Sequence, residues 1–293
     1  MSEHTGAVVV GVDGSDLAIA AARWAGAVAA RVGAPLHIVH AMVGVGRGLT
    51  EAGAAIQAAI MSYQADTAPI FLKDATDAVH ADYPDLTVTT ASHREPADHV
   101  LTAASREARL IVLGGNEINA ASLLLLGSTT LAVAAHAHCP VVAWRGGQTA
   151  LNGQPVVVGT DGSPSGAAAL AAAFDFADRF GVSVRAVRAW SPRIPAAAVD
   201  AQLGEALHSA QRAQLLGEVN RLTERYPAVA VDCLVEQDTP AQAVISHCEG
   251  AQLVIVGTRG RNALASTLLG STSLNLLQHS PVPVMVCRAE GTE

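Results

Sequence analysis

The stretch from Leu253 to Ser271 reads LVIVGTRGRNALASTLLGS, and the rest of the chain is best understood from it. Its first four residues form an apolar run that predicts a buried parallel strand, and this strand leads into Gly257. Gly260 comes three positions later, and nine residues then separate Gly260 from Gly270. The sequence therefore predicts a strand that ends in an extended glycine loop.

A helix is predicted directly after this loop, because TSLNLLQ has the apolar spacing of a helix and Ser271 or Thr272 could cap its first turn. Glycines permit positive φ and let the backbone approach a ligand closely. A helix start offers unpaired N–H groups and the positive end of a dipole. Arg259 and Arg261 add charged donors that suit phosphate oxygens. Such glycines can be turn residues and such arginines can be merely solvated, but the combination predicts a polyphosphate site.

Composition favours a globular protein of more than one domain. The chain has 293 residues, half of them hydrophobic but only 3% aromatic, so the core must be built from Ala, Val, Leu and Ile. The formal net charge of −8 argues against a nucleic-acid partner. Four cysteines without CxxC spacing indicate reduced thiols, and the N-terminus lacks the basic region of a signal peptide. We therefore expect a cytoplasmic protein.

One uncharged stretch, Ile118 to Trp144, is long enough to span a bilayer. Glycine, proline, histidine and hydroxyl residues interrupt it, which fits a loop, a helix and a strand better than a membrane span. It contains His136, His138 and Cys139, which resemble a metal cluster but which we expect to be structural. We predict neither a membrane partner nor a metal site.

The chain is a tandem repeat. VVVGVDGS at residues 8–15 recurs as VVVGTDGS at 156–163, ARLIVLG at 108–114 recurs as AQLVIVG at 251–257, and LGSTT at 126–130 recurs as LGSTS at 269–273. Order and spacing are kept, which indicates two copies of one domain of about 140 residues. We place the domains at residues 1–147 and 154–293, joined by a Gly-rich linker.

Strands and helices alternate within each copy. In the first copy, strands are predicted near residues 7–12, 36–41, 86–91, 110–114 and 141–144, and helices near 15–32, 51–81, 96–107 and 128–138. In the second, strands are predicted near 155–160, 182–190, 229–235, 253–257 and 284–287. This alternation predicts an α/β fold with a parallel sheet covered on both faces. Such sheets bind ligands at the carboxyl ends of their strands, where the strand order reverses.

The first strand of each copy ends in a second candidate half of the site. Gly11 and Asp13 in the first copy correspond to Gly159 and Asp161 in the second, and each motif opens a helix. The aspartate could accept hydrogen bonds from a ribose or a base. It could equally cap the helix together with the serine that follows it, so both roles remain open.

These motifs together resemble those of the universal stress protein family, in its tandem, ATP-binding form. The family motif Gly-x2-Gly-x9-Gly-(Ser/Thr) is matched by Gly257, Gly260, Gly270 and Ser271, and its first-strand aspartate by Asp13 and Asp161. The resemblance implies two Rossmann-like domains, each a five-stranded parallel sheet of order 3-2-1-4-5 flanked by helices. It implies ATP, which Mg²⁺ could accompany, with adenosine near the first strand and phosphates on the glycine loop.

The resemblance also assigns the binding residues and the role. The implied nucleotide-binding residues are Gly159, Asp161, Gly257, Thr258, Arg259, Gly260, Arg261, Gly270, Ser271 and Thr272, followed in the first copy by Gly11, Asp13, Gly114, Gly127 and Ser128. Members of the family often act as nucleotide-dependent regulators of stress response, dormancy or growth. A homodimer and an unidentified protein partner are therefore expected.

The two copies differ at the glycine loop. Glu117 stands where the second copy has Gly260, and Asn116 and Ile118 replace the two arginines. Two like charges about 4 Å apart repel by about 1 kcal/mol in water and about 4 kcal/mol at an effective dielectric constant of 20. We therefore predict strong ATP binding in the second copy and weak or no binding in the first, unless Glu117 turns outward or holds Mg²⁺.

Three other functions compete with a nucleotide-binding regulator. A slow ATPase or phosphotransferase would need a general base near the phosphates, and neither a GxxxxGK[ST] loop nor a Ser-His-Asp set is present. We expect weak hydrolysis at most and assign no catalytic residue. A nicotinamide-dependent Rossmann enzyme is disfavoured because the glycine loop follows the fourth strand. A nucleotide-independent dimerisation scaffold remains open.

Overall fold

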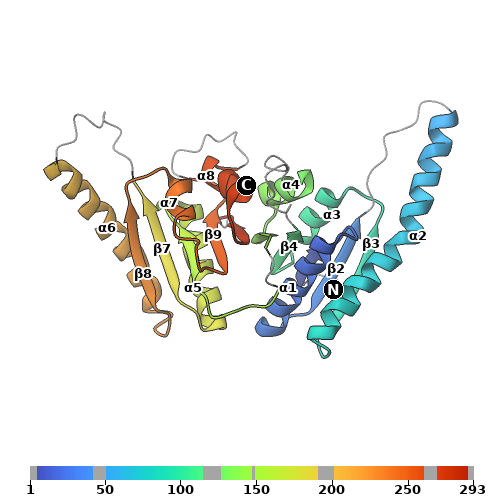
Figure 1. The fold of residues 1–293 in the computed structure, drawn as a ribbon, viewed down its shortest axis with the longest axis horizontal. Helices are drawn as coiled ribbons and strands as arrows, with labels where there is room; N and C mark the ends of the chain where they lie inside the picture. The colour runs from blue at the N-terminus through green and yellow to red at the C-terminus, as the bar shows by residue number, and fades with distance from the viewer. Residues whose placement is uncertain are drawn as a thin grey trace. The chain divides into compact units, whose positions relative to one another are not determined.

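The computed structural model describes residues 5–41, 51–114, 127–146, 149–190, 201–260 and 269–289. By its internal contacts the chain divides into two compact units, the first extending to Leu151 and the second beginning at Asn152. Each is an α/β unit, as predicted, while the domain limits at 147 and 154 stay predictions (Figure 1).

The first unit contains a five-stranded parallel sheet in the order β3-β2-β1-β4-β5. Its elements are β1 (Val8–Gly11), α1 (Asp16–Val32), β2 (Leu36–Ala41), α2 (Glu51–Asp82), β3 (Val88–His93), α3 (Ala97–Ala104), β4 (Leu110–Gly114), α4 (Ser128–His136) and β5 (Val141–Trp144). The central strand β1 pairs Val8 with Leu36 on one side and with Leu110 on the other. The predicted order 3-2-1-4-5 is confirmed.

The second unit repeats this order as β8-β7-β6-β9-β10, again with parallel strands. Its elements are β6 (Val156–Gly159), α5 (Pro164–Phe180), β7 (Val184–Ala189), α6 (Ala201–Thr223), β8 (Val231–Glu236), α7 (Pro240–Ile245), β9 (Leu253–Gly257), α8 (Ser271–His279) and β10 (Val284–Cys287). The central strands of both units are almost entirely buried Val, Ile and Leu, because helices cover both faces of the sheet.

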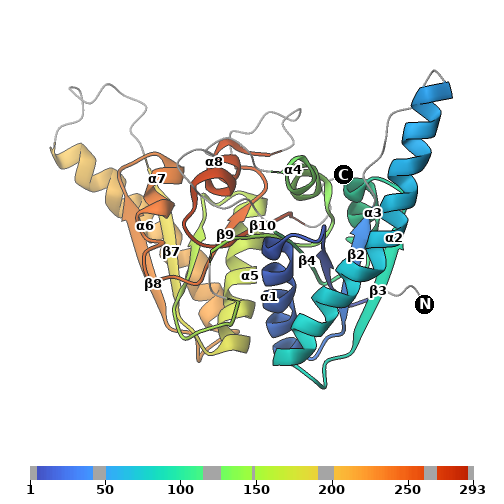
Figure 2. The ribbon, with the colours of Figure 1, turned by 45° about the vertical axis from the view of Figure 1, so that its right-hand side comes forward.

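Within each unit the helices form two layers. In the first, α1 packs on α2 and on β1 and β4, while α3 packs on α4. In the second, α5 packs on α6, and α7 packs on α8 on the opposite face of the sheet (Figures 1 and 2). The first helix of each unit is rich in alanine, so its backbone can lie close to the central strands.

A serine at the N-terminus and a glycine at the C-terminus bound the first helix of each unit. Ser15 caps α1 by accepting a hydrogen bond from the Ala18 amide at 3.1 Å, and Ser163 caps α5 through the Gly166 amide at 3.1 Å. Gly33 and Gly181 end the two helices in the left-handed conformation, with φ of 64° and 66°. The expectation that the aspartate or the serine of each motif caps the helix is confirmed, and in both units the capping residue is the serine.

The edge strands begin later than the sequence predicts. β3 was expected from residue 86 and begins at Val88, and β8 was expected from residue 229 and begins at Val231. In both units a turn occupies the expected start: the Leu86 amide donates to the Tyr83 carbonyl, and the Val229 amide to the Tyr226 carbonyl.

The described part of the uncharged stretch 118–144 forms α4 and β5, as expected. Over the residues with described structure, none of the helices could cross a bilayer.

Candidate nucleotide-binding site

A cavity of about 390 Å³ opens at the carboxyl ends of β6, β7 and β9 in the second unit. Its lining residues are Gly159, Thr160, Asp161, Gly166, Val187, Ala189, Pro240, Val244, Val256, Gly257, Arg259, Gly260, Leu269, Gly270, Ser271, Thr272 and Ser273. β6 and β9 are neighbours whose following connections run to opposite sides of the sheet, so the cavity lies at the point where the strand order reverses. Eight of the ten residues predicted for the second copy line this one cavity.

The turn after β6 forms one wall of the cavity. The Oδ1 atom of Asp161 accepts a hydrogen bond from the Ser163 amide at 2.9 Å. The Ser163 hydroxyl, besides capping α5, lies 3.3 Å from the Arg259 carbonyl and donates to it. Ser163 therefore ties the aspartate turn to the glycine loop and caps α5, while Asp161 holds the Ser163 amide and lines the cavity.

Two glycines of the loop, Gly257 and Gly260, are needed for space and not for positive φ. Among the described residues with positive φ, none belongs to this motif, so the expectation based on backbone freedom is wrong for Gly257, Gly260 and Gly270. A Cβ atom on Gly257 would lie 2.6 Å from the Ser165 carbonyl carbon, which means that the start of α5 packs directly on this strand end. A Cβ atom on Gly260 would lie 2.7 Å from Asp161 Oδ2.

The start of α8 forms the opposite wall. The N-cap residue is Gly270, with φ −71° and ψ 155°, and no side chain caps the helix, so the expected cap by Ser271 or Thr272 is wrong. The Gly270 amide donates to the Thr258 carbonyl at 2.7 Å, and the Ser273 hydroxyl donates to the Gly257 carbonyl at 2.6 Å. These bonds hold the helix start against the strand end. The hydroxyls of Ser271 and Thr272 are consequently not used as caps, and both residues line the cavity.

Thr258 is placed differently from the other predicted residues. It is only 2% exposed and does not line the cavity. Its hydroxyl has no hydrogen-bond partner in the part of the chain that the structure describes. Thr258 therefore contributes through its backbone, by holding Gly270.

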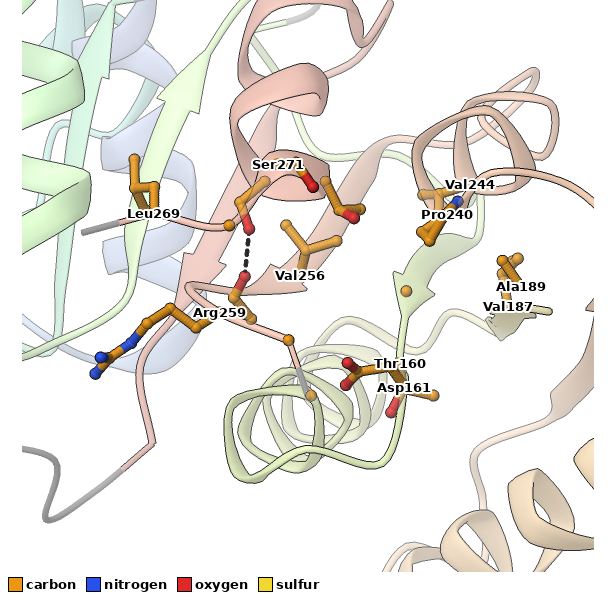
Figure 3. A pocket seen from close by; sticks show the side chains of 17 residues that line it. Thr160, Asp161, Val187, Ala189, Pro240, Val244, Val256, Arg259, Leu269 and Ser271 are labelled. Carbon is orange, nitrogen blue, oxygen red and sulfur yellow. Dashed lines mark hydrogen bonds between the residues drawn. The ribbon is translucent and has the colours of Figure 1, made fainter. Parts of the chain in front are cut away.

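An apolar group of residues, which the sequence-based prediction missed, completes the cavity. Val187 and Ala189 come from the end of β7, and Pro240 and Val244 from α7. Figure 3 shows these four on the side of the cavity away from Arg259 and Leu269, with Thr160 and Asp161 between the two ends. Neither the two strand residues nor the two helix residues belong to a sequence motif that distinguishes them from core residues. The cavity therefore has an apolar end and a polar end.

Arg259 lines the polar end of the cavity. In Figure 3 the Arg259 side chain extends away from Asp161. The pKa of Arg288, directly after β10, is lowered, first by burial and then by the charge of Arg259. The Thr258 amide donates to the Cys287 carbonyl at 2.8 Å, which keeps the ends of β9 and β10 together. Arg261 lies outside the described residues.

Comparison with known proteins agrees with this architecture. A model of the universal stress protein family matches residues 5–145 and, a second time, residues 153–288. The chain belongs to the universal stress protein family. A universal stress protein of Mycolicibacterium smegmatis is 33% identical over 292 residues, which cover 96% of each chain. Universal stress protein Rv2005c of Mycobacterium tuberculosis is 35% identical over 299 residues, again with 96% of each chain covered.

The fold is also that of solved members of the family. The crystal structure of a universal stress protein from Archaeoglobus fulgidus superposes with a TM-score of 0.67 at 18% identity, covering 99% of this chain and 98% of that one. The tandem form inferred from the internal repeat is thereby confirmed.

In this universal stress protein the first unit places its motif residues in the same elements. Gly11 and Gly114 end β1 and β4, Gly127 is the N-cap residue of α4, and Ser128 is its first residue. Asp13 differs from Asp161, because its Oδ1 accepts from both the Ser15 amide at 3.0 Å and the Ser15 hydroxyl at 2.6 Å. Glu117, Asn116 and Ile118 lie outside the described residues, so the predicted weakness of this site stays a prediction.

The candidate metal cluster of this universal stress protein is spread over separate contacts. His136 Nδ1 donates to the Ala132 carbonyl at 2.9 Å, and the His138 amide donates to the Ser105 hydroxyl at 2.9 Å. Cys139 is buried, and burial raises its pKa to about 12. Nowhere in the described ranges do three or more His, Cys, Asp or Glu side chains gather in a way that could hold a metal ion.

Proposed function

We propose that the second unit binds ATP in the cavity between the Asp161 turn and α8. The adenine would lie at the apolar end, near Val187 and Val244, and the ribose beside Asp161, whose carboxylate can accept from its hydroxyls. The phosphates would lie at the polar end, where the first-turn amides of α8 and the hydroxyls of Ser271 and Thr272 are donors. Mg²⁺ would enter with the phosphates it neutralises.

One observation carries this proposal. A single cavity joins an apolar end, a carboxylate acceptor and a donor-rich helix start in the order in which a nucleotide presents base, sugar and phosphate. A glycine turn without a ligand would need neither the apolar group at the far end nor a helix start facing the same space. The residues present therefore fit the nucleotide that the family resemblance implies.

The cavity favours binding over chemistry. Asp161 is the one acidic residue among the described residues that line it, and it lies in the turn after β6 and not at the start of α8. Hydrolysis would need a base close to the terminal phosphate, so we expect at most weak ATPase activity. The family resemblance supports a cytoplasmic, homodimeric regulator of stress response, dormancy or growth that acts on a protein partner.

The test is to identify what the purified protein retains. Protein purified without added nucleotide is denatured by heat, and the released small molecules are identified by mass spectrometry. The expected result is an adenine nucleotide in a ratio of no more than one per chain, and a nucleotide-free preparation that binds added Mg·ATP in calorimetry. Absence of a retained nucleotide together with no heat of binding would contradict the proposal and favour a dimerisation scaffold.

A further inference from the structure

A buried ion pair lies directly behind the Asp161 turn. Arg188, on β7, is 1% exposed, and its Nη2 atom donates to both carboxylate oxygens of Glu218, on α6, at 2.8 Å each. The Glu218 side chain is 20% exposed. Withdrawing two charges from water is costly, and their attraction often does no more than balance that cost. The pair is therefore poorly explained by stability alone.

The pair contacts the residues on both sides of Asp161. The Thr160 hydroxyl donates to Glu218 Oε2 at 3.4 Å, and the Gly162 amide donates to the Thr160 hydroxyl at 3.4 Å. Gly162 has φ of +79°, and a Cβ atom there would lie 3.0 Å from Glu218 Oε1 and 3.3 Å from Arg188 Nη2. The turn that carries Asp161 is thus fitted around the carboxylate and the guanidinium.

The first unit fills the same space with a histidine and a phenylalanine. His40 is the fifth residue of β2, as Arg188 is of β7, and its Nδ1 atom donates to the Val12 carbonyl at 2.8 Å. Phe71 of α2 packs edge-on against the His40 ring, with centroids 5.5 Å apart. A Cβ atom on Gly14 would lie 2.5 Å from the Phe71 ring, just as one on Gly162 would meet Glu218.

Two positions therefore change together between the units: Val12 and His40 in the first correspond to Thr160 and Arg188 in the second. Phe71 and Glu218 stand at different positions along α2 and α6, but each places its side chain beside the turn glycine, Gly14 or Gly162. The fold is built with either set, so it requires only that the space be filled. The polar set occurs in the unit that has the complete glycine motif.

We propose that Arg188 and Glu218 are positioning residues for nucleotide binding, which fix the turn of Thr160, Asp161 and Gly162 so that the Asp161 carboxylate faces the ribose. This inference rests on the proposed function. The pair acts through the turn, at the sugar end of the cavity, and not on the phosphates. Its loss should therefore weaken all ligands that contain ribose and leave a phosphate-only ligand unaffected.

The main test transplants the first unit's arrangement into the second. The triple variant Thr160→Val, Arg188→His, Glu218→Phe replaces the ion pair with the types of side chain that surround Gly14 in the first unit, and circular dichroism checks that it folds. Its affinity for both ATP and adenosine should fall about tenfold, as expected when an oriented hydrogen-bonding group is lost. Its affinity for inorganic triphosphate should stay within twofold of the wild-type value, which a general loosening of the unit would not allow.

A second variant decides the matter if the transplant does not fold. Glu218→Gln removes the charge but keeps the size, and it should weaken adenosine and ATP by a common factor of about three while sparing triphosphate. Arg179→Met, which breaks an exposed pair with Asp175 on α5, is the control and should leave all three affinities unchanged.

The outcomes separate this inference from the proposed function. If wild-type protein binds no ATP, the proposed function fails. Suppose instead that the wild type binds ATP. The positioning role is then wrong if the folded triple variant binds adenosine and ATP with wild-type affinity, and Glu218→Gln is judged in the same way if the triple variant does not fold. Equal losses for triphosphate and for the ribose ligands would also overturn it.

Discussion

The Oδ2 atom of Asp161 lies 2.7 Å from the position that a Cβ atom on Gly260 would take, so the carboxylate occupies the space left by the missing side chain. The two residues are 99 positions apart in the chain, and both line the cavity. Their contact brings the turn after β6 against the glycine loop. The second glycine of the motif is thus matched to a protein carboxylate. This relationship links both halves of the predicted site.

Substitution of Gly260 should affect binding more than folding. In Gly260→Ala the new Cβ meets the end of a side chain and not backbone, so Asp161 can turn aside at little cost to stability. We expect ATP affinity to fall at least about tenfold, because the ribose acceptor is displaced. Calorimetry measures this loss, and Gly153→Ala, where a Cβ would meet nothing within 4 Å, is the control. Unchanged affinity in Gly260→Ala would contradict the role given to this contact.

Substitution of Gly257 should affect folding first. A Cβ there would lie 2.6–2.7 Å from the backbone and Cβ of Ser165, and neither the strand end nor the helix start can easily retreat. We expect Gly257→Ala to lower the free energy of unfolding by about 2–3 kcal/mol. At the corresponding Gly114 the nearest backbone atoms lie at 3.3–3.4 Å, so Gly114→Ala should cost less than about 1 kcal/mol. Urea denaturation compares them, and equal losses would refute the prediction.

The sequence predicted the fold well because strong local patterns coincide with the buried strands. The strands at 110–114, 141–144, 253–257 and 284–287 were predicted to the residue, since each is a short apolar run between turn signals. The edge strands β3 and β8 were misplaced by two residues, because they are half exposed and turns at Tyr83 and Tyr226 precede them. Periodicity gives little guidance where one face of a strand is solvated.

The site was predicted only as far as its motif extends. Glycine spacing identified most of the polar end, but Val187 and Val244 carry no signal that distinguishes them from core residues. The packing of Gly257 on Ser165 and the ion pair behind Thr160 depend on contacts between distant segments, which spacing cannot show. The cap at Gly270 was missed because a glycine before two hydroxyl residues suggested capping by a side chain.

The two capping serines should differ in their effect on the ligand. Ser15→Ala and Ser163→Ala each remove a cap and should lower stability by about 1 kcal/mol. The Ser163 hydroxyl also donates to the Arg259 carbonyl, whereas that of Ser15 donates to Asp13. Only Ser163→Ala should therefore loosen the glycine loop and weaken ATP binding. Thermal denaturation and calorimetry on both variants check this, and a matching loss of affinity in Ser15→Ala would contradict it.

Two buried thiols should be unreactive in the folded protein. Burial raises the pKa of Cys139 to about 12 and that of Cys248 to about 11. An unfolded thiol has a pKa of about 8.5, so both cysteines stabilise the fold below that pH, and this contribution is lost as the pH rises toward their folded pKa values. At pH 8 alkylation should be slow at both and become fast on denaturation. Peptide mapping by mass spectrometry reports each site, and rapid labelling of native Cys139 or Cys248 would contradict the prediction.

The central claim concerns a nucleotide cavity in the second unit, and titration of nucleotide-free protein with Mg·ATP tests it most directly. Calorimetry on the wild type and on Gly260→Glu, which places the first unit's acid beside Asp161 and the phosphates, measures both affinity and stoichiometry. The account predicts one tight site per chain in the wild type and none in the variant, with the fold retained. Two equal tight sites per chain, or undiminished binding in a folded Gly260→Glu protein, would contradict it.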